Sequence, residues 1–341
     1  MKITMKITKR IARSFIFPVL MKGRFDLLLR CFSNKSLLNI MYHGVVNIDS
    51  NYFSPRNIHV NQFEKQIIYL KKNFNIVSVE EAFKMIQDNL KPKKKTITIS
   101  FDDGLQNNLY TALPIIVKHK VPVTFFISSI CTVENSTPYL WSELISALIY
   151  FHKDEIIMID ELVFKNFIET SSKTSIFNFL KACDFAQRDR ILGLIEDKYK
   201  ISEKIKTIPE EVWKLMNSKE LIKFSSSPFV TIGSHGHLHY NLGIISREKS
   251  IIELVESKKL LEKVIEKEIN MIAYPDGCYT NEIKDITESV GYKYQFAVNY
   301  RVNNDINDKR IMNRHGISSG TTYDSNVLFI NKAFITAGIK M

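Results

Sequence analysis

Short apolar runs of strand length alternate along most of the chain with segments whose apolar residues recur at helical spacing. The runs predict strands at residues 37–42, 96–101, 121–128, 229–233, 270–274 and 294–298. The segments predict helices around residues 63–70 and at 80–88, 109–120 and 247–267, the second beginning at the capping-box pair Ser78 and Glu81. This alternation is typical of a parallel α/β sheet or barrel.

Residues 131–212 break the alternation. Their pattern is mainly helical, with Trp141, Leu144 and Leu148 at helical spacing. We therefore predict an α/β domain over residues 37–330 that carries a mainly helical insertion at about 131–212. The insertion is compatible with a lid or substrate wall, and equally with a purely structural cap.

The first 36 residues form a segment of their own, with nine Lys or Arg side chains and one acidic residue, Asp26. Apolar residues such as Phe15 and Val19 lie among these charges, so the segment suits the surface of an anionic membrane. A solvated helix packed on the domain is an equally good interpretation. Arg13 interrupts the apolar run and no small-residue cleavage site follows, so the segment is a poor secretion signal.

Composition narrows the class of protein. Of the 341 residues 45% are hydrophobic and 24% charged, as in ordinary globular proteins, and no apolar run reaches the roughly 18 to 20 residues of a membrane span. The net charge of +11 comes largely from the first 36 residues, which argues against a nucleic-acid partner. The four cysteines lack disulfide or metal spacing and favour a reducing compartment. We expect a cytoplasmic protein, with contact at the inner face of a membrane left open.

Two clusters of chemically active side chains follow predicted strands. Asp102 and Asp103 end the strand at 96–101 and precede a glycine, and the carboxyl ends of parallel strands are where ligands bind. His235, His237 and His239 follow the strand at 229–233. On a helical turn, His235 and His239 would share one face and reach one metal ion, whereas His237 would point away.

Two histidines and one carboxylate make a metal site with positions open for water and substrate, suited to Zn²⁺ and also to Co²⁺, Mn²⁺, Ni²⁺ or Fe²⁺. The second carboxylate is then free to act as a base on water. Two further strand ends carry weaker signals. Tyr274, Pro275 and Asp276 form a turn that is common without any function, and a lone His43 more often has a structural role.

The order of these motifs resembles that of the polysaccharide deacetylase family, also called the NodB-homology or carbohydrate esterase family 4 type. Phe-Asp-Asp-Gly at 101–104, Gly-Ser-His-x-x-x-His at 233–239 and Ala-Tyr-Pro-x-Gly at 273–277 carry the resemblance. It covers about residues 37–130 and 213–318, and leaves out the N-terminal segment and the insertion.

The resemblance implies a distorted (β/α) barrel with one divalent metal ion at the strand ends, for which Zn²⁺ is the expected ion. In that family pattern Asp102 is the general base and the metal ligands are Asp103, His235 and His239. The backbone N–H of Asp276 is the oxyanion donor.

The same resemblance suggests further roles in the reaction. Tyr42 and His43 resemble the opening of a branch that acts on exopolysaccharides, so His43 is the favoured general acid, with His315 as the rival. Tyr274, Pro275 and Arg314 are expected on the substrate side, and Arg314 is also a candidate for orienting a catalytic group.

The expected reaction is hydrolysis of an N-acetyl group on an amino sugar of a polysaccharide, oligosaccharide or lipid-linked glycan. Three alternatives stay open: an O-acetyl esterase, a cyclic amidohydrolase on the same fold, and a catalytically silent carbohydrate-binding protein.

Overall fold

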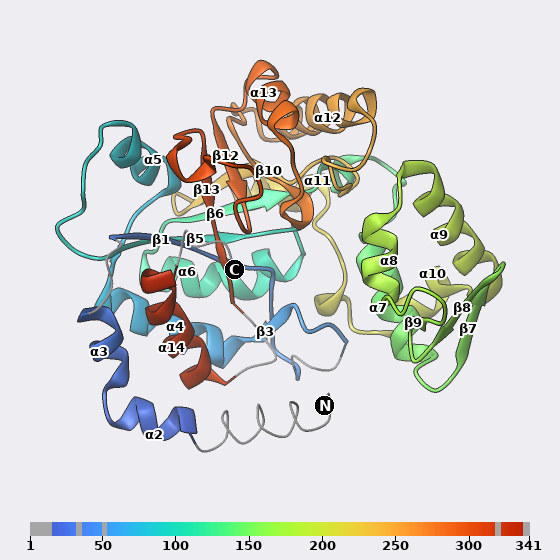
Figure 1. Ribbon diagram of the computed structural model, residues 1–341, viewed down its shortest axis with the longest axis horizontal. Coiled ribbons are helices and arrows are strands. Elements are labelled where there is room, and N and C mark those ends of the chain that lie inside the picture. Colours follow the sequence, from blue (N-terminus) through green and yellow to red (C-terminus); the bar gives the residue numbers. More distant parts are fainter. Residues whose placement is uncertain (1–15, 32–35, 50–52, 318–321, 337–341) are drawn as a thin grey trace.

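A parallel β-barrel forms the centre of the molecule. The computed structural model describes residues 16–31, 36–49, 53–317 and 322–336. Within them, eight parallel strands follow one another around a nearly closed barrel in the order β13, β12, β11, β10, β6, β5, β1, β14, and β4 pairs with β5 outside this path (Figure 1). The strands are β1 Leu37–Tyr42, β4 Asn75–Ile76, β5 Thr96–Phe101, β6 Val123–Ile127, β10 Val230–Ser234, β11 Met271–Ala273, β12 Tyr294–Ala297, β13 Ile311–Asn313 and β14 His315–Gly316. The predicted (β/α) barrel is confirmed.

The two edges of the sheet meet in one short segment of chain. Strands β13 and β14 are separated only by Arg314, and they pair with β12 and β1 respectively. A bend at Arg314 therefore lets consecutive residues serve both edges. Across the gap, the Asn39 side-chain amide on β1 donates to the carbonyl of Asn313 at 3.0 Å.

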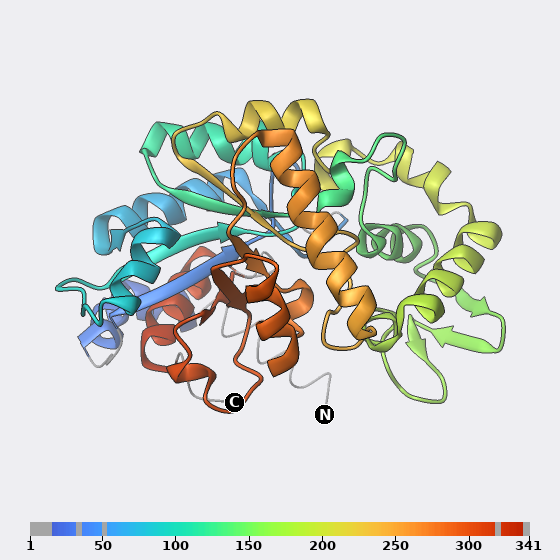
Figure 2. The same cartoon turned by 90° about the horizontal axis from the view of Figure 1, so that it is seen from above.

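Helices surround the barrel (Figure 2). They are α4 Val60–Asn73, α5 Val79–Gln87, α6 Leu113–His119, α11 Ser218–Ser225, α12 Arg247–Ile265, α13 Asn281–Ser289 and α14 Tyr323–Thr336. Helix α5 begins with the predicted capping box of Ser78 and Glu81. The helix predicted at 109–120 consists of a π-helical turn, Asn108–Ala112, followed by α6.

Alternation along β5 separates two environments. Ile97, Ile99 and Phe101 pack outward into the main apolar core beneath the helices. Thr98 and Ser100 face the barrel interior, where the Thr98 hydroxyl donates to Asn39 Oδ1 at 2.6 Å. The interior is therefore partly polar, and it can hold a charged side chain close to the strand ends.

The insertion forms a separate lobe beside the barrel (Figure 1). It contains α7 Trp141–Phe151, β7 Ile156–Ile159, β8 Leu162–Lys165, β9 Ile168–Glu169, α8 Ile176–Ala182, α9 Phe185–Tyr199 and α10 Ile201–Lys204 around an apolar cluster of its own. The predicted helices are present, but the antiparallel sheet β7–β8–β9 was missed. Its first strand alternates between exposed and buried positions, yet all four residues are apolar, so the sequence hides the alternation.

The N-terminal helices α2 Phe17–Lys22 and α3 Phe25–Cys31 pack against α14. Asp26 is buried there and accepts hydrogen bonds from the Tyr69 hydroxyl at 2.9 Å and from Arg30 at 3.0 Å. For residues 16–31 the interpretation as helices packed on the domain therefore holds, while residues 1–15 lie outside the described part. No helix in the described ranges is long and apolar enough to cross a membrane.

Two short strands, β2 Gly44–Val46 and β3 Asn57–His59, pair with each other at the edge of the barrel.

Candidate metal centre

The register of the barrel brings the predicted side chains to one end. Tyr42 pairs with Phe101, so His43 and Asp102 leave neighbouring strands side by side. Ser234 at the end of β10 pairs with Ile127 of β6, and His235 follows it at the same edge. Chain segments about 60 to 190 residues apart in sequence therefore deliver their polar side chains to a single place.

Asp103, His235 and His239 converge as predicted. All three are buried, and one ligand atom from each lies within 4.8 Å of the others. Asp103 Oδ1 lies 3.6 Å from His235 Nε2 and 3.4 Å from His239 Nε2. Two atoms each bound at about 2.1 Å to one tetrahedral ion would lie about 3.4 Å apart. Asp103 Oδ1 has no hydrogen-bond partner in the described part of the chain, and a buried carboxylate oxygen in that state fits a cation.

Hydrogen bonding and burial prepare His235 to act as a ligand. Its Nδ1 contacts the carbonyl of Ala273 at 2.8 Å, which leaves Nε2 with a lone pair aimed at Asp103. Burial lowers the pKa of His235 to about 4, so the ring is neutral at physiological pH. Neutral imidazole is the form that binds metal ions. For His239 burial lowers the pKa, but the Asp103 carboxylate outweighs burial and the pKa is raised.

The loop that carries the histidines is not a helical turn, so that expectation is wrong. Gly236 has φ +77° and His239 φ +57°, both in the left-handed region. The Glu253 carboxylate on α12 holds the loop by accepting the N–H groups of His237 and Leu238, each at 2.9 Å. A β-carbon on residue 236 would lie 3.2 Å from that carboxylate, which is a reason for glycine there.

His237 points away from the metal site, as expected. Its Nδ1 contacts the Ser129 hydroxyl at 2.8 Å, and the ring is absent from the cluster of candidate ligands. It therefore has a structural contact instead of a ligand role.

The second oxygen of Asp103 contacts Arg56, a residue that no sequence motif marks. The Arg56 guanidinium lies 3.4 Å from Asp103 Oδ2, donates to Ser142 Oγ at 3.1 Å and forms an ion pair with Glu143. Burial alone would raise the pKa of Asp103. The effects of His239, His43 and Arg56 outweigh burial and bring the pKa well below its ordinary value, so the carboxylate stays ionised. Oδ2 is thus fixed while Oδ1 faces the imidazoles.

Arg314 orients the candidate base, Asp102. Its guanidinium donates to Asp102 Oδ1 at 2.5 Å and to Oδ2 at 2.8 Å, and it lies over the rings of Phe126 and Phe296 inside the barrel. Burial raises the pKa of Asp102, but Arg314 and His235 outweigh it and the pKa is lowered. Arg314 is fully buried and does not line the pocket, so its expected contact with substrate is wrong and the orienting role is the one that its position supports.

A cavity of about 410 Å³ opens in front of these residues. The barrel contributes His43, Asp102, Asp103, His235, His239 and Asp276, among others. The insertion contributes Trp141, Ser142, Ser146, Phe177 and Lys181. The insertion therefore forms one wall of the pocket, which favours the wall over the purely structural cap.

His43 and His315 are placed differently. His43 is half-buried at the end of β1 and lines the cavity, and Asn108 fixes its backbone by donating to its carbonyl at 2.9 Å. His315 lies on β14, with its ring 6.3 Å from that of Phe329, and is absent from the cavity lining. Of the two candidate acids, only His43 faces the pocket.

The turn at 275–277 has a mixed outcome. Asp276 lines the cavity with φ +54°, and its side chain forms an ion pair with Lys181 of the insertion. Tyr274 is fully buried, and its hydroxyl contacts Gln295 at 2.7 Å and Thr287 at 3.1 Å. Tyr274 and the buried Pro275 are not in the lining, so their predicted contact with substrate is wrong. The Tyr274 side chain points into the core, where its hydroxyl has these two partners.

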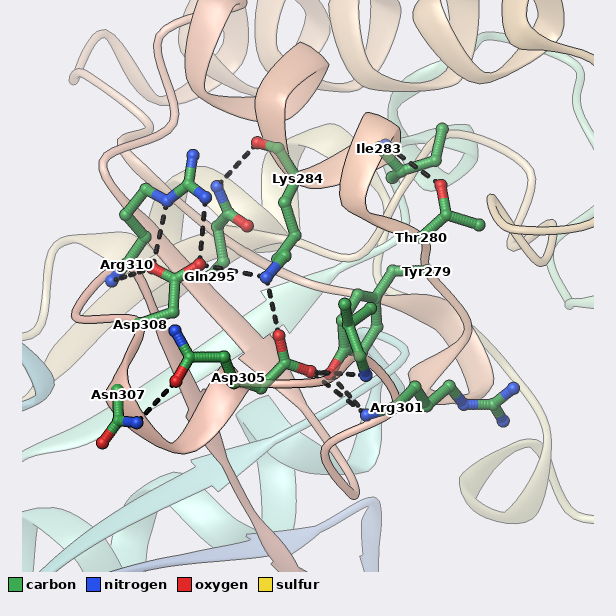
Figure 3. A network of polar contacts seen from close by, with 12 residues as sticks. Tyr279, Thr280, Ile283, Lys284, Gln295, Arg301, Asp305, Asn307, Asp308 and Arg310 are labelled. Atoms are coloured by element: carbon green, nitrogen blue, oxygen red, sulfur yellow. Dashed lines mark hydrogen bonds and ion pairs between the residues drawn. The ribbon is translucent and has the colours of Figure 1, made fainter.

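A second cluster of buried charges lies beyond β12 (Figure 3). Lys284 donates to Asp305 at 2.6 Å and to Asp308 at 3.0 Å. The other oxygen of Asp305 accepts the Tyr279 hydroxyl at 2.6 Å, and Arg310 contacts both oxygens of Asp308. Each carboxylate oxygen drawn in this network therefore has a protein donor.

Comparison with known proteins agrees with the geometry. The family model described as "Polysaccharide deacetylase" matches residues 89–153 and 197–295, and the unmatched stretch between them lies inside the insertion. The chain belongs to the polysaccharide deacetylase family. A Bacillus subtilis protein, YxkH, named for an assumed polysaccharide deacetylase activity, is 20% identical over 255 residues, which are 74% of this chain and 61% of that protein.

Solved structures share the fold of this family member. The Streptococcus pyogenes deacetylase PplD in complex with acetate matches with TM-score 0.55 and 16% identity over 86% of this chain and 96% of its own. IcaB from Ammonifex degensii matches with TM-score 0.55 and 15% identity over 88% and 99%. A de-N-acetylase from Aggregatibacter actinomycetemcomitans matches with TM-score 0.53 and 16% identity over 85% and 99%.

Proposed function

We propose that this chain is a metal-dependent hydrolase that removes N-acetyl groups from an amino sugar in a polysaccharide, oligosaccharide or lipid-linked glycan. The observation that carries the proposal is the buried oxygen of Asp103, which has no hydrogen-bond partner among the residues described and lies between two imidazole nitrogens, beside a second carboxylate held by Arg314. Family membership and the names of the relatives support the same reaction class.

Asp103, His235 and His239 would hold the ion. When bound, a divalent ion would supply Lewis-acid polarisation of the acetyl carbonyl and lower the pKa of a water molecule. Asp102 accepts the proton of the attacking water, and Arg314 keeps its carboxylate ionised and oriented. The backbone N–H of Asp276 donates to the developing oxyanion. His43 then protonates the departing amine, giving acetate and a free amino sugar.

The lining of the cavity supports a sugar as the substrate. Trp141 and Phe177 supply aromatic surface, while Ser142, Ser146 and Lys181 supply polar groups from the same wall. A mainly apolar wall with a few polar groups is usual for small-molecule sites. The two Lys and Arg side chains that line the cavity both have an acidic partner, since Lys181 pairs with Asp276 and Arg56 with Glu143. That balance favours a neutral acetylated sugar over an anionic one.

Acetate release is the direct test. The metal-free protein would be loaded with Zn²⁺, Co²⁺, Mn²⁺, Ni²⁺ or Fe²⁺ and assayed on N-acetylglucosamine oligomers, acetylated xylan and a cyclic ureide. Acetate from the oligomers in the wild type, and none from Asp103→Asn or His235→Ala, is the expected result. Release only from xylan would replace the proposal by an O-acetyl esterase, and ring opening of the ureide by a cyclic amidohydrolase. Oligosaccharide binding without any product would make the chain a carbohydrate-binding protein.

The general acid is tested by a matched pair of substitutions. His43→Gln is expected to slow release of the amine about 100-fold or more, because general acids commonly contribute that much. His315→Gln is expected to leave the rate within about threefold. Equal losses, or a larger loss for His315→Gln, would move the role to the other histidine.

We also propose that the N-terminal segment contacts an anionic membrane surface, where a lipid-linked glycan would be found. Val19 is 67% exposed and Ile16 49% exposed on the described helices, and nine basic residues lie in the first 36 positions. Vesicles with and without phosphatidylserine test this in a co-sedimentation experiment. The double variant Val19→Asp/Lys22→Glu is expected to lose binding to the anionic vesicles, and unchanged binding would contradict the proposal.

A further inference from the structure

The insertion grips the chain at a metal ligand. Arg188 on α9 and the indole N–H of Trp141 on α7 both donate to the backbone carbonyl of His239, at 3.3 and 3.4 Å. The next two residues are held as well. The Tyr240 hydroxyl donates to Asp189, and the Asn241 side-chain amide donates to the carbonyl of Lys181 at 2.8 Å. Three consecutive residues, beginning with the ligand, are therefore bonded to the insertion.

Arg188 is an unusual residue for an insertion that serves only as a cap. It is 2% exposed, with its guanidinium 3.4 Å from the ring centre of Tyr240 and 5.1 Å from that of Trp141. Its Nε has no hydrogen-bond partner within the described ranges. A buried arginine with an unused donor is a poor source of stability. Its contact with the His239 carbonyl therefore calls for a different explanation.

The backbone of His239 explains what the contact achieves. A non-glycine residue at φ +57° is disfavoured and persists only where its surroundings hold it. The donors from Arg188 and Trp141 hold the carbonyl on one side of this residue, and the stacked rings of Phe185 and Tyr240, 4.3 Å apart, hold the other. The direction of the Cα–Cβ bond of His239, from which the imidazole extends, follows from that backbone conformation.

A separate contact from the insertion reaches another ligand. Glu143 on α7 forms an ion pair with Arg56, and Arg56 lies 3.4 Å from Asp103 Oδ2. The insertion thus acts on two of the three candidate ligands, His239 directly through Arg188 and Asp103 through Arg56.

We propose that Arg188 is a positioning residue for the metal centre, and that the insertion pre-organises the site in addition to lining the pocket. This inference rests on the metal site of the proposed function. It assigns a part of the metal affinity to the insertion.

Cobalt binding tests the inference without any substrate. Co²⁺ would be titrated into metal-free wild type, Arg188→Met and Arg190→Met while its visible absorption is followed. Arg190 lies two residues along the same helix, and its side chain is 71% exposed and pairs with Asp160, so it is a matched control. Arg188→Met is expected to weaken Co²⁺ binding about 10- to 100-fold and to change the absorption bands, as loss of an outer-shell contact does. Arg190→Met is expected to stay within about twofold.

Unchanged Co²⁺ affinity and absorption in a folded Arg188→Met protein would overturn the proposal and leave Arg188 with a packing role. If that variant does not fold, Trp141→Phe decides the question, because it keeps an aromatic ring at this position and removes the N–H donor. A weaker and spectrally altered Co²⁺ site in Trp141→Phe supports positioning of His239 through its carbonyl, and a wild-type site in that variant refutes it. A protein that binds Co²⁺ through Asp103 but cleaves no acetylated saccharide would end the proposed function, while the comparison of Arg188 with Arg190 still decides this inference.

Discussion

Two groups of charged side chains in this protein both place carboxylates beside basic residues, but they differ in whether every carboxylate oxygen has a hydrogen-bond donor. In the network around Lys284, Asp305 and Asp308, every carboxylate oxygen meets an N–H or O–H of the protein. At the metal centre, one oxygen of Asp103 has no hydrogen-bond partner among the described residues and faces two imidazole nitrogens. The protein itself therefore satisfies the carboxylates of the first group, whereas the Asp103 oxygen needs a cation.

This contrast gives a criterion that separates structural charges from functional ones. Burial and perturbed pKa values occur in both groups, since the pKa is lowered for Asp305 as it is for Asp103. Perturbation alone therefore does not identify the site. A buried oxygen that faces two imidazole nitrogens and has no hydrogen-bond partner in the described part of the chain does, because such an oxygen costs free energy unless something positive binds it.

The largest effect is expected from Asp102→Asn. The substitution keeps the shape and one of the two acceptor atoms for Arg314 but removes the base, so turnover is expected to fall about 10³- to 10⁴-fold. Metal content measured by atomic absorption is expected to stay at the wild-type level. Loss of the metal together with activity would instead make Asp102 a ligand, and its assignment as the base would be wrong.

Removing a carboxylate from each group should lower stability by very different amounts. Asp305→Ala leaves Lys284 buried without its main partner, and urea unfolding is expected to show a loss of about 3–5 kcal/mol. Asp103→Asn in the metal-free protein removes a charge that is only partly compensated, so its loss is expected to stay below about 1 kcal/mol. Comparable losses for both variants in the absence of metal would show that the two groups are alike after all.

Metal addition sharpens the same contrast. A hundredfold excess of metal over its Kd is expected to stabilise the wild type by about 2.7 kcal/mol, measured as a rise in Tm. Asp305→Ala should show a similar gain from its lower starting point, because its metal site is intact. Asp103→Asn should show none, and a rise in its Tm equal to that of the wild type would place the ion elsewhere.

The smallest effect concerns acid. Burial raises the pKa of Asp305, but hydrogen bonds from Lys284 and Tyr279 outweigh it, so the folded pKa lies below the unfolded value of about 3.9. As the pH falls, the unfolded chain binds the proton first, and the contribution of Asp305 to stability declines. The stability difference between wild type and Asp305→Ala is therefore expected to be constant from about pH 5 to 8 and to shrink below about pH 4. A difference that grows in acid would contradict this origin.

Much of the fold could be predicted because local pattern and tertiary structure agree. Thr96–Phe101 is a strand with exactly the predicted bounds, since it is an apolar run with a turn signal directly after it. Ile156–Ile159 could not be recognised in the same way, because its exposed positions are also apolar. Strands β13 and β14 are too short to leave a pattern at all.

The site was predictable only where its residues sit in compact motifs. Asp102, Asp103, His235 and His239 each follow a strand, and strand register brings them together. Arg56 could not be found, because its partner Glu143 is 87 residues away and nothing in either neighbourhood marks them. Tyr274 was assigned to the substrate side through the family resemblance, and its strand-end position does not fix the direction of its side chain.

The position of Arg314 ties the geometry of the base to closure of the barrel. Every candidate ligand of the ion precedes residue 240, whereas the residue that fixes the base is the hinge between the two closing strands. A change that opens the barrel between β13 and β14 would therefore also release Asp102 from its orienting contact, even where the three ligands keep their places.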